Sequence, residues 1–137
     1  MEQSTIKTLL EDRSEAIRKK DLNQLMSYYS SDVVYFDIPG QYIGSDALRG
    51  RFTNWFNSYE GEIIQDISDL DIKLNDTIAI TSMLIRSGGT LKNGQEVKLQ
   101  ARTTSCYQKV NGGWLITHEH VSLPVDLKTG NALLNPR

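Results

Sequence analysis

DLNQLMSYYSSDVVYFDIPG, residues 21–40, combines three structural signals in one short stretch. Apolar residues recur at helical spacing over residues 21–29, and a polar segment then interrupts this pattern. Residues 33–38 are mostly β-branched and aromatic, which predicts a strand, and Pro39-Gly40 predicts a turn. This stretch therefore predicts a short helix that is followed closely by a strand and a turn.

Further helices are predicted on both sides of this stretch. Residues 4–20 form an amphipathic pattern whose apolar stripe consists of Ile6, Leu9, Leu10 and Ile17. After the turn, Ser45 or Asp46 can cap a third helix. One face of this third helix is predicted to carry Leu48, Phe52, Trp55 and Phe56.

The sequence changes character after Gly61, because long strand patterns replace the helical ones. Strands are predicted at residues 63–74, 77–87, 96–109 and 114–123. The connections at 75–76, 88–94 and 111–113 are rich in Asn and Gly, which is typical of hairpin turns. Consecutive hairpins predict a curved antiparallel meander.

Helices that precede one antiparallel sheet are typical of the α+β class. We therefore expect a single domain over residues 1–137, with a cone-shaped curved antiparallel sheet wrapped around three helices. Such a cone leaves an internal pocket with an open mouth. The chain is long enough to bury a core without disulfides or metals.

Composition excludes several classes of partner. The net charge of -2 and the scattered basic residues predict no nucleic-acid or membrane binding. No apolar segment is long enough to span a bilayer, and the N-terminus lacks the pattern of a signal peptide. The lone Cys106 cannot form an internal disulfide, so the expected location is cytoplasmic.

Two charged residues fall where the pattern predicts apolar ones. Arg13 lies near the middle of the apolar stripe of the first helix, so it either pairs with a carboxylate for structural reasons or serves the pocket. Asp37 shares the face of Val33 and Tyr35 in the first strand. It either helps to form the turn or points into the pocket as a general base.

His118 and His120 alternate with Glu119 on the last strand. Strict alternation predicts that both imidazoles face the same side as Trp114 and Ile116 and that Glu119 faces solvent or a partner subunit. In a simple hairpin the opposing residues are Arg102, Thr104 and Cys106. Two histidines without a third spaced ligand do not predict a metal site.

Aromatic residues are frequent in the first half of the chain. We expect most of them in the core and one or two at the mouth of the cone, stacked against a ligand. The candidates are Tyr35, Tyr42, Trp55 and, from the last strand, Trp114.

The motifs resemble those of SnoaL-like and ketosteroid-isomerase-like proteins of the nuclear transport factor 2-like superfamily. The resemblance rests on residues 21–40, on Gly44-Ser-Asp-Ala-Leu48, and on Arg102 and Thr104 followed by Trp114 and His118-x-His120-x-Ser122. The motifs are also similar to those of the association domain of calcium/calmodulin-dependent kinase II. This fold hosts isomerases, cyclases, dehydratases and non-catalytic assembly modules.

In the resemblance, Asp37 corresponds to the base of the steroid isomerases. The tyrosine donor of those enzymes falls at Arg13, and their protonated carboxylic acid falls at or beside Thr104. The family's oxyanion donors are therefore replaced here. An arginine can still hold an enolate or a carboxylate because it brings a full charge.

Two functions follow from these patterns. In the first, Asp37 moves a proton on a small apolar carbonyl compound, Arg13 or Arg102 holds the oxyanion, and His118 or His120 acts as a second acid or base, with no cofactor. In the second, the domain is a non-catalytic binding or assembly module whose pocket either captures a small, carboxylate-bearing acid or is merely packed. The resemblance implies a homodimer, formed by the outer face of the sheet.

Overall fold

The computed structural model describes residues 2–135; Met1 and residues 136–137, the ends of the predicted domain, lie outside the described residues. The helices are α1 (Glu2–Arg18), α2 (Leu22–Met26) and α3 (Ser45–Asn57). The strands are β1 (Tyr29–Phe36), β2 (Gln41–Ile43), β3 (Tyr59–Leu74), β4 (Ile78–Leu91), β5 (Glu96–Val110) and β6 (Gly113–Ser122).

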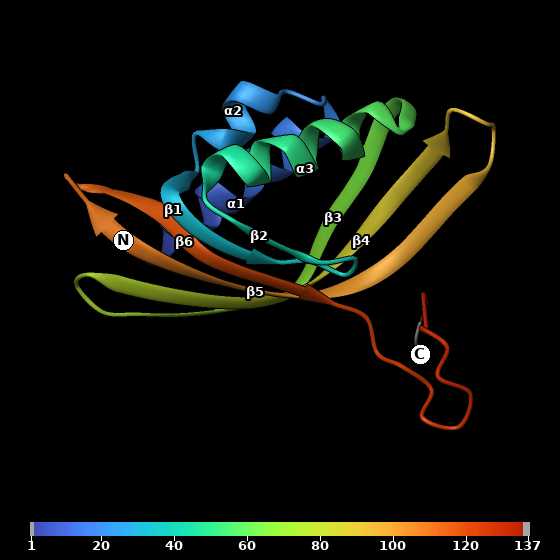
Figure 1. The fold of residues 1–137 in the computed structure, drawn as a ribbon. Coiled ribbons are helices and arrows are strands. Elements are labelled where there is room, and N and C mark those ends of the chain that lie inside the picture. The colour runs from blue at the N-terminus through green and yellow to red at the C-terminus, as the bar shows by residue number, and fades with distance from the viewer. Residues whose placement is uncertain (1, 136–137) are drawn as a thin grey trace.

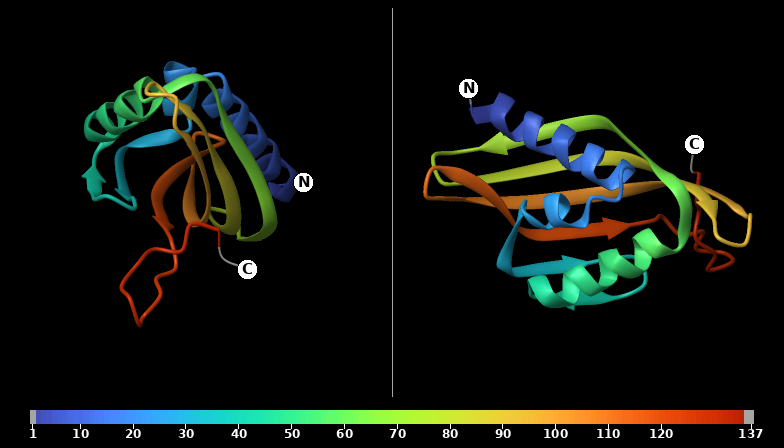
Figure 2. Two further views of the ribbon diagram at one scale, coloured as in Figure 1. Left: turned by 90° about the vertical axis from the view of Figure 1, so that its right-hand side faces the viewer. Right: turned by 90° about the horizontal axis from the view of Figure 1, so that it is seen from above.

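The six strands form one curved, open sheet in the order β2-β1-β6-β5-β4-β3. The helices lie against its concave face, so the predicted α+β cone is confirmed (Figures 1 and 2). One pairing differs from the predicted antiparallel meander, because β1 runs parallel to β6. The chain can make this parallel pairing because it crosses from β1 to the opposite edge of the sheet through α3.

The core fills the space between helices and sheet. Helix α1 packs over β3 and contributes Ile6, Leu10 and Ile17, which are all buried. Helix α3 covers β1 and β2 with Leu48 and Phe52. The predicted helix stripes are therefore the faces that the sheet covers, as the helical period requires.

Strand β6 contains a bulge that overturns one prediction. Cys106 pairs with His118 but the next residue, Tyr107, pairs with Ile116, so β6 holds one additional residue at Thr117. An additional residue shifts the alternation by one position, so each residue after the bulge lies on the face opposite to the one that strict alternation predicts. Glu119 is fully buried inside the cone, and the expectation that it faces solvent or a partner is wrong.

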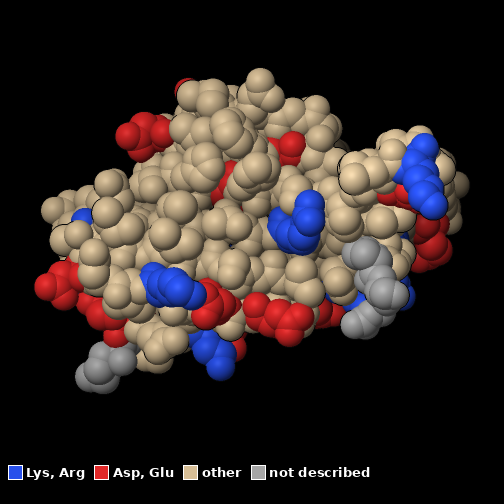
Figure 3. All heavy atoms as spheres, turned by 90° about the horizontal axis from the view of Figure 1, so that it is seen from below, with Lys and Arg blue, Asp and Glu red and all other residues tan. Residues whose placement is uncertain are grey.

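The outer face of the sheet carries His118 and His120. Two rows cross four strands there: Ile80, Cys106, His118 and Val34, and Ser82, Thr104, His120 and Phe36. Both imidazoles contact the edge or face of the Phe36 ring, at centroid distances of 5.3 and 5.6 Å. A view from this side shows a wide area with few charged side chains (Figure 3).

A buried ion pair joins the first helix to the last strand. Arg13 Nη2 donates to Glu119 Oε1 at 2.8 Å, and the two side chains are 2% and 0% exposed. Tyr29 donates to the same oxygen at 2.6 Å, and Ser105 donates to Oε2. The charge of Arg13 is therefore compensated inside the core, as burial demands.

The ion pair makes a specific prediction about stability. Glu119→Leu alone leaves the Arg13 charge buried without a partner, which we expect to lower the free energy of unfolding by about 3–5 kcal/mol. Replacing both partners, Arg13→Met with Glu119→Leu, should recover most of this loss because no charge then remains in the core. Urea unfolding of the single and double variants measures both values. A double variant no more stable than the single one would contradict this account.

Candidate functional site

A cavity of about 110 Å³ lies between the helices and the concave face of the sheet. Its helix side is formed by α1 and α3, and its sheet side by the inward residues of β1, β3, β4, β5 and β6. Ile38, whose side chain is half-exposed, is also part of the lining. The volume is below the roughly 150 Å³ of an apolar cavity known to hold benzene, so a ligand that contains a ring must extend out of the cavity.

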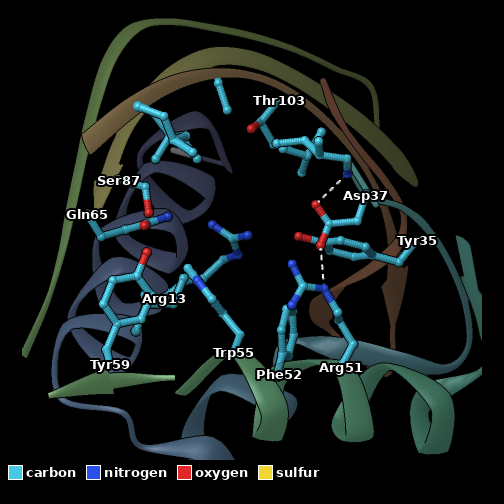
Figure 4. Close-up of a pocket in the computed structure, with 16 residues that line it drawn as sticks. Arg13, Tyr35, Asp37, Arg51, Phe52, Trp55, Tyr59, Gln65, Ser87 and Thr103 are labelled. Carbon is cyan, nitrogen blue, oxygen red and sulfur yellow. Dashed lines mark hydrogen bonds and ion pairs between the residues drawn. The ribbon is translucent and has the colours of Figure 1, made fainter. Parts of the chain in front are cut away.

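Arg13 presents an unused nitrogen to this cavity. Its Nε donates to the Tyr29 hydroxyl at 2.9 Å and its Nη2 to Glu119, whereas Nη1 is buried without a partner. Desolvation acts to lower the pKa of Arg13, but the charge of Glu119 and the neighbouring tyrosines outweigh it, so the pKa lies well above its ordinary value. The guanidinium is therefore a permanently charged donor, held in place by Tyr29 and Glu119. Figure 4 shows it among the residues that line the cavity.

Asp37 lies on another wall of the same cavity. Its Oδ2 accepts from Arg51 Nε at 2.9 Å, and its Oδ1 accepts from the backbone N–H of Ile38 at 2.7 Å. Arg51 comes from α3, so this ion pair connects the end of β1 to the helix that covers it. Both contacts orient the carboxylate, which retains further lone pairs on each oxygen.

Two uncharged polar side chains line the sheet wall. Gln65 and Thr103 are 4% and 2% exposed, and Gln65 Oε1 and Thr103 Oγ1 have no hydrogen-bond partner. Both side chains point into the cavity in Figure 4. A buried polar atom without a partner carries a desolvation cost, so these atoms are available to a ligand.

Aromatic rings form much of the helix wall. Phe52 meets Tyr35 edge to face at a centroid distance of 5.5 Å and lies 6.2 Å from Trp55. Burial, and then the charges of Glu119 and Asp37, raise the pKa of the Tyr35 phenol well above its ordinary value. Tyr35 therefore stays protonated and offers an O–H group beside an apolar surface.

Four of the predicted site residues line the cavity: Arg13, Tyr35, Asp37 and Trp55. The sequence left open whether Arg13 pairs with a carboxylate or serves the pocket. It does pair with a carboxylate, and that partner is Glu119 and not Asp37. The roles of these four residues toward a ligand remain predictions.

The other predicted site residues do not line the cavity. The bulge turns His118 and His120 outward. Thr104, which pairs with His120, and Arg102, which pairs with Ser122, are exposed on the same outer face. Tyr42 is half-buried on the edge strand β2. Trp114 is buried at the far end of the sheet, where its indole N–H donates to Glu2 at 3.1 Å.

Several cavity residues were missed in the sequence, although most of them carry a signal. Arg51 lies on the apolar face of α3, three residues after Leu48. Gln65 shares one face of its strand with the apolar residues Ile63 and Ile67. Thr103 likewise lies on the face formed by the buried residues two positions before and after it. Glu119, which does not line the cavity but holds Arg13, carries no such signal, because only the bulge turns it inward.

Neither a metal centre nor a membrane span is found in the part of the chain that the structure describes. No three His, Cys, Asp or Glu side chains within residues 2–135 are grouped to hold a metal ion. None of the described helices is long and apolar enough to cross a bilayer.

No curated protein sequence matches this chain. An NTF2-like protein of unknown function from Pseudomonas putida is 26% identical, with a TM-score of 0.88 over 98% of this chain and 94% of that one. An NTF2-like superfamily protein from Salmonella enterica (18% identity, TM-score 0.81, coverage 93% and 94%) has the same fold. So does the association domain of C. elegans CaMKII (15%, 0.71, 88% and 95%). The sequence matches the SnoaL-like domain over residues 6–126, and the chain therefore belongs to the SnoaL-like family of the NTF2-like superfamily.

Proposed function

We propose that the cavity binds a small, mostly apolar carbonyl compound and that Asp37 transfers a proton on it. The observation that carries this proposal is the buried Arg13 Nη1, a charged donor without a partner that shares a cavity with a carboxylate. A donor held rigidly in a water-poor site stabilises a developing negative charge far more than it would in water.

The chemistry follows from this arrangement. The Asp37 carboxylate removes a proton from the carbon next to the carbonyl, and the electrons of the C–H bond form an enolate. Arg13 Nη1 stabilises the negative oxygen, with the Tyr35 hydroxyl as a second donor on the same cavity. Return of the proton to another carbon isomerises the compound, and expulsion of a leaving group completes an elimination. Neither route requires a cofactor.

A second function is favoured by one observation. Both oxygens of Asp37 already accept hydrogen bonds, and the charge of Arg51 lies against one of them. In this arrangement the carboxylate serves to hold Arg51 at the cavity wall and not to accept a proton. In this alternative the domain binds its ligand without turnover, which fits the likeness to an association domain.

We also propose that two copies associate through the outer face of the sheet. Phe36, Ile78, Ile80 and Val110 are exposed by 39–45% on strands β1, β4 and β5. Together with the two rows that hold His118 and His120, they form a surface with few charges, which soluble monomers seldom expose over a large area.

Asp37→Asn should slow proton exchange at least 100-fold, because a general base contributes about 10²–10⁴-fold and the amide cannot accept the proton. Acetophenone in D₂O is a suitable probe, with loss of its methyl proton signal followed by NMR. Asp32→Asn is the matched control, since Asp32 is exposed on β1, the strand that ends just before Asp37. Equal exchange rates for wild type and Asp37→Asn would rule out this role.

Arg13→Lys separates the donor from the structural charge. A lysine can still pair with Glu119 but has no equivalent of Nη1, the nitrogen that faces the cavity. The fold should therefore persist while the rate of proton exchange falls by about 100-fold. Circular dichroism checks the fold and the same NMR assay measures the rate. An unchanged exchange rate would show that Arg13 Nη1 does not stabilise the enolate.

Ile80→Lys should convert the dimer to a monomer, because it places an unpaired charge twice in a symmetric interface. We expect the dimer Kd to rise by about 100-fold or more. Light scattering coupled to gel filtration measures the mass. Leu74→Lys, at the end of the edge strand β3, is the control and should leave the dimer intact. Wild-type protein that is monomeric at high micromolar concentration would contradict the proposal.

A further inference from the structure

We infer that Gln65 and Ser87 form a polar subsite that binds a hydroxyl group of the ligand, on the side of the cavity away from Asp37. This inference rests on the proposed function, which supplies a carbonyl compound as the ligand. It adds that the compound carries a hydroxyl group several bonds from its carbonyl, and it names the two residues that select for that group.

Gln65 and Ser87 are direct neighbours in the sheet. Gln65 on β3 pairs with Ser87 on β4, and both side chains line the cavity. Side chains that are directly opposite in an antiparallel pair have Cβ atoms about 4.5–5.5 Å apart. One small group can therefore contact both residues at the same time, and Figure 4 shows the two side chains next to each other on the cavity wall.

The carbonyl oxygen of the Gln65 side chain has no partner in the protein. The residue is 4% exposed, and its Oε1 accepts no hydrogen bond. A buried acceptor without a partner destabilises the fold, whereas a leucine at the same position would not. Buried polar groups in folded proteins are nearly always paired, so this oxygen is matched to a donor that enters the cavity.

Two contacts position this part of the cavity before a ligand arrives. Arg18 Nη2 donates to the backbone oxygen of Gln65 at 2.6 Å, which ties β3 to helix α1 next to Ile17 of the cavity wall. The ring of Tyr59, which also lines the cavity, packs on Gly89, where a Cβ atom would lie 3.1 Å from it. A wall that is already in place reduces the cost of ordering on binding.

The subsite lies apart from the residues proposed for proton transfer. Strands β6 and β5 separate β4 from β1, the strand that ends just before Asp37, and neighbouring strands are about 4.8 Å apart. In Figure 4, Gln65 and Ser87 lie on one side of the cavity, and Asp37 with Arg51 on the other. The group bound at the subsite is therefore not the group that reacts, and a short chain separates the two in the ligand.

A hydroxyl is the group that fits both residues. It donates to Gln65 Oε1 and accepts from the Ser87 hydroxyl in one pose. It fits equally when the amide nitrogen of Gln65 faces it, because it then accepts from the amide and donates to Ser87. A second carbonyl or a carboxylate only accepts, and would leave Gln65 Oε1 without a partner.

Matched pairs of ketones test the subsite by binding alone. The probes are 4-hydroxy-2-butanone, 5-hydroxy-2-pentanone and 6-hydroxy-2-hexanone, each compared with the parent ketone that lacks the hydroxyl, and NMR titration of the protein measures each Kd. The three chain lengths place the hydroxyl at different distances from the carbonyl. We expect one hydroxyketone to bind about tenfold more tightly than its parent, and the other two to gain less.

Substitutions assign this preference to the two residues. Ser87→Ala and Gln65→Met each remove one partner, so each should reduce the preference to about threefold or less while the Kd of the parent ketone changes little. Ser82→Ala is the matched control, because Ser82 is an exposed serine on the outer face of the same strand, and it should keep the full preference. Ser87→Ala decides the question if Gln65→Met does not fold.

The outcomes separate this inference from the proposed function. If the ketones bind but no hydroxyketone binds more tightly than its parent, or if the preference survives Ser87→Ala, the inference is wrong and the proposed function stands. If the preference depends on Gln65 and Ser87 while Asp37→Asn leaves proton exchange unchanged, the subsite stands and the proposed catalysis fails. If no ketone binds, both are wrong.

Discussion

The buried ion pair between Arg13 and Glu119 constrains how the helices dock on the sheet. It connects the first helix to the last strand through the centre of the core, and Tyr29 and Ser105 add contacts from β1 and β5. A charge in such a place is tolerated only when its partner is placed accurately. The helix layer and the sheet must therefore dock in one register, and the bulge in β6 is what brings Glu119 to the inner side.

The same pair also shapes the cavity. Because Glu119 and Tyr29 occupy two of the three guanidinium nitrogens, the third is left facing the ligand space with its charge already compensated. Asp37 and Arg51 form a second compensated pair on the wall of the same cavity. The cavity is thus strongly polar at defined atoms and close to neutral as a whole, a combination that suits the stabilisation of charge that develops during a reaction.

The two faces of the sheet carry different kinds of residues. The inner face carries the cavity, with small and polar residues such as Thr103 among apolar ones, and the outer face carries histidines and apolar residues in rows across four strands. The proposed dimer uses only the outer face, so assembly leaves the cavity untouched. Residues that sequence patterns assign to chemistry, His118 and His120, belong to the outer surface.

Local patterns along the chain predicted the class of fold, the three helices and the four long strands, and showed that Arg13 and Asp37 interrupt the apolar pattern. These features follow from local period and from charges that break it, and both can be read along the chain. The tertiary structure alone decided that β1 runs parallel to β6, that Glu119 and not Asp37 holds Arg13, and that His118 and His120 point outward. The physical reason is the same in each case. Strand order and a bulge depend on contacts between distant segments, and a shift of one residue exchanges the two faces of a strand.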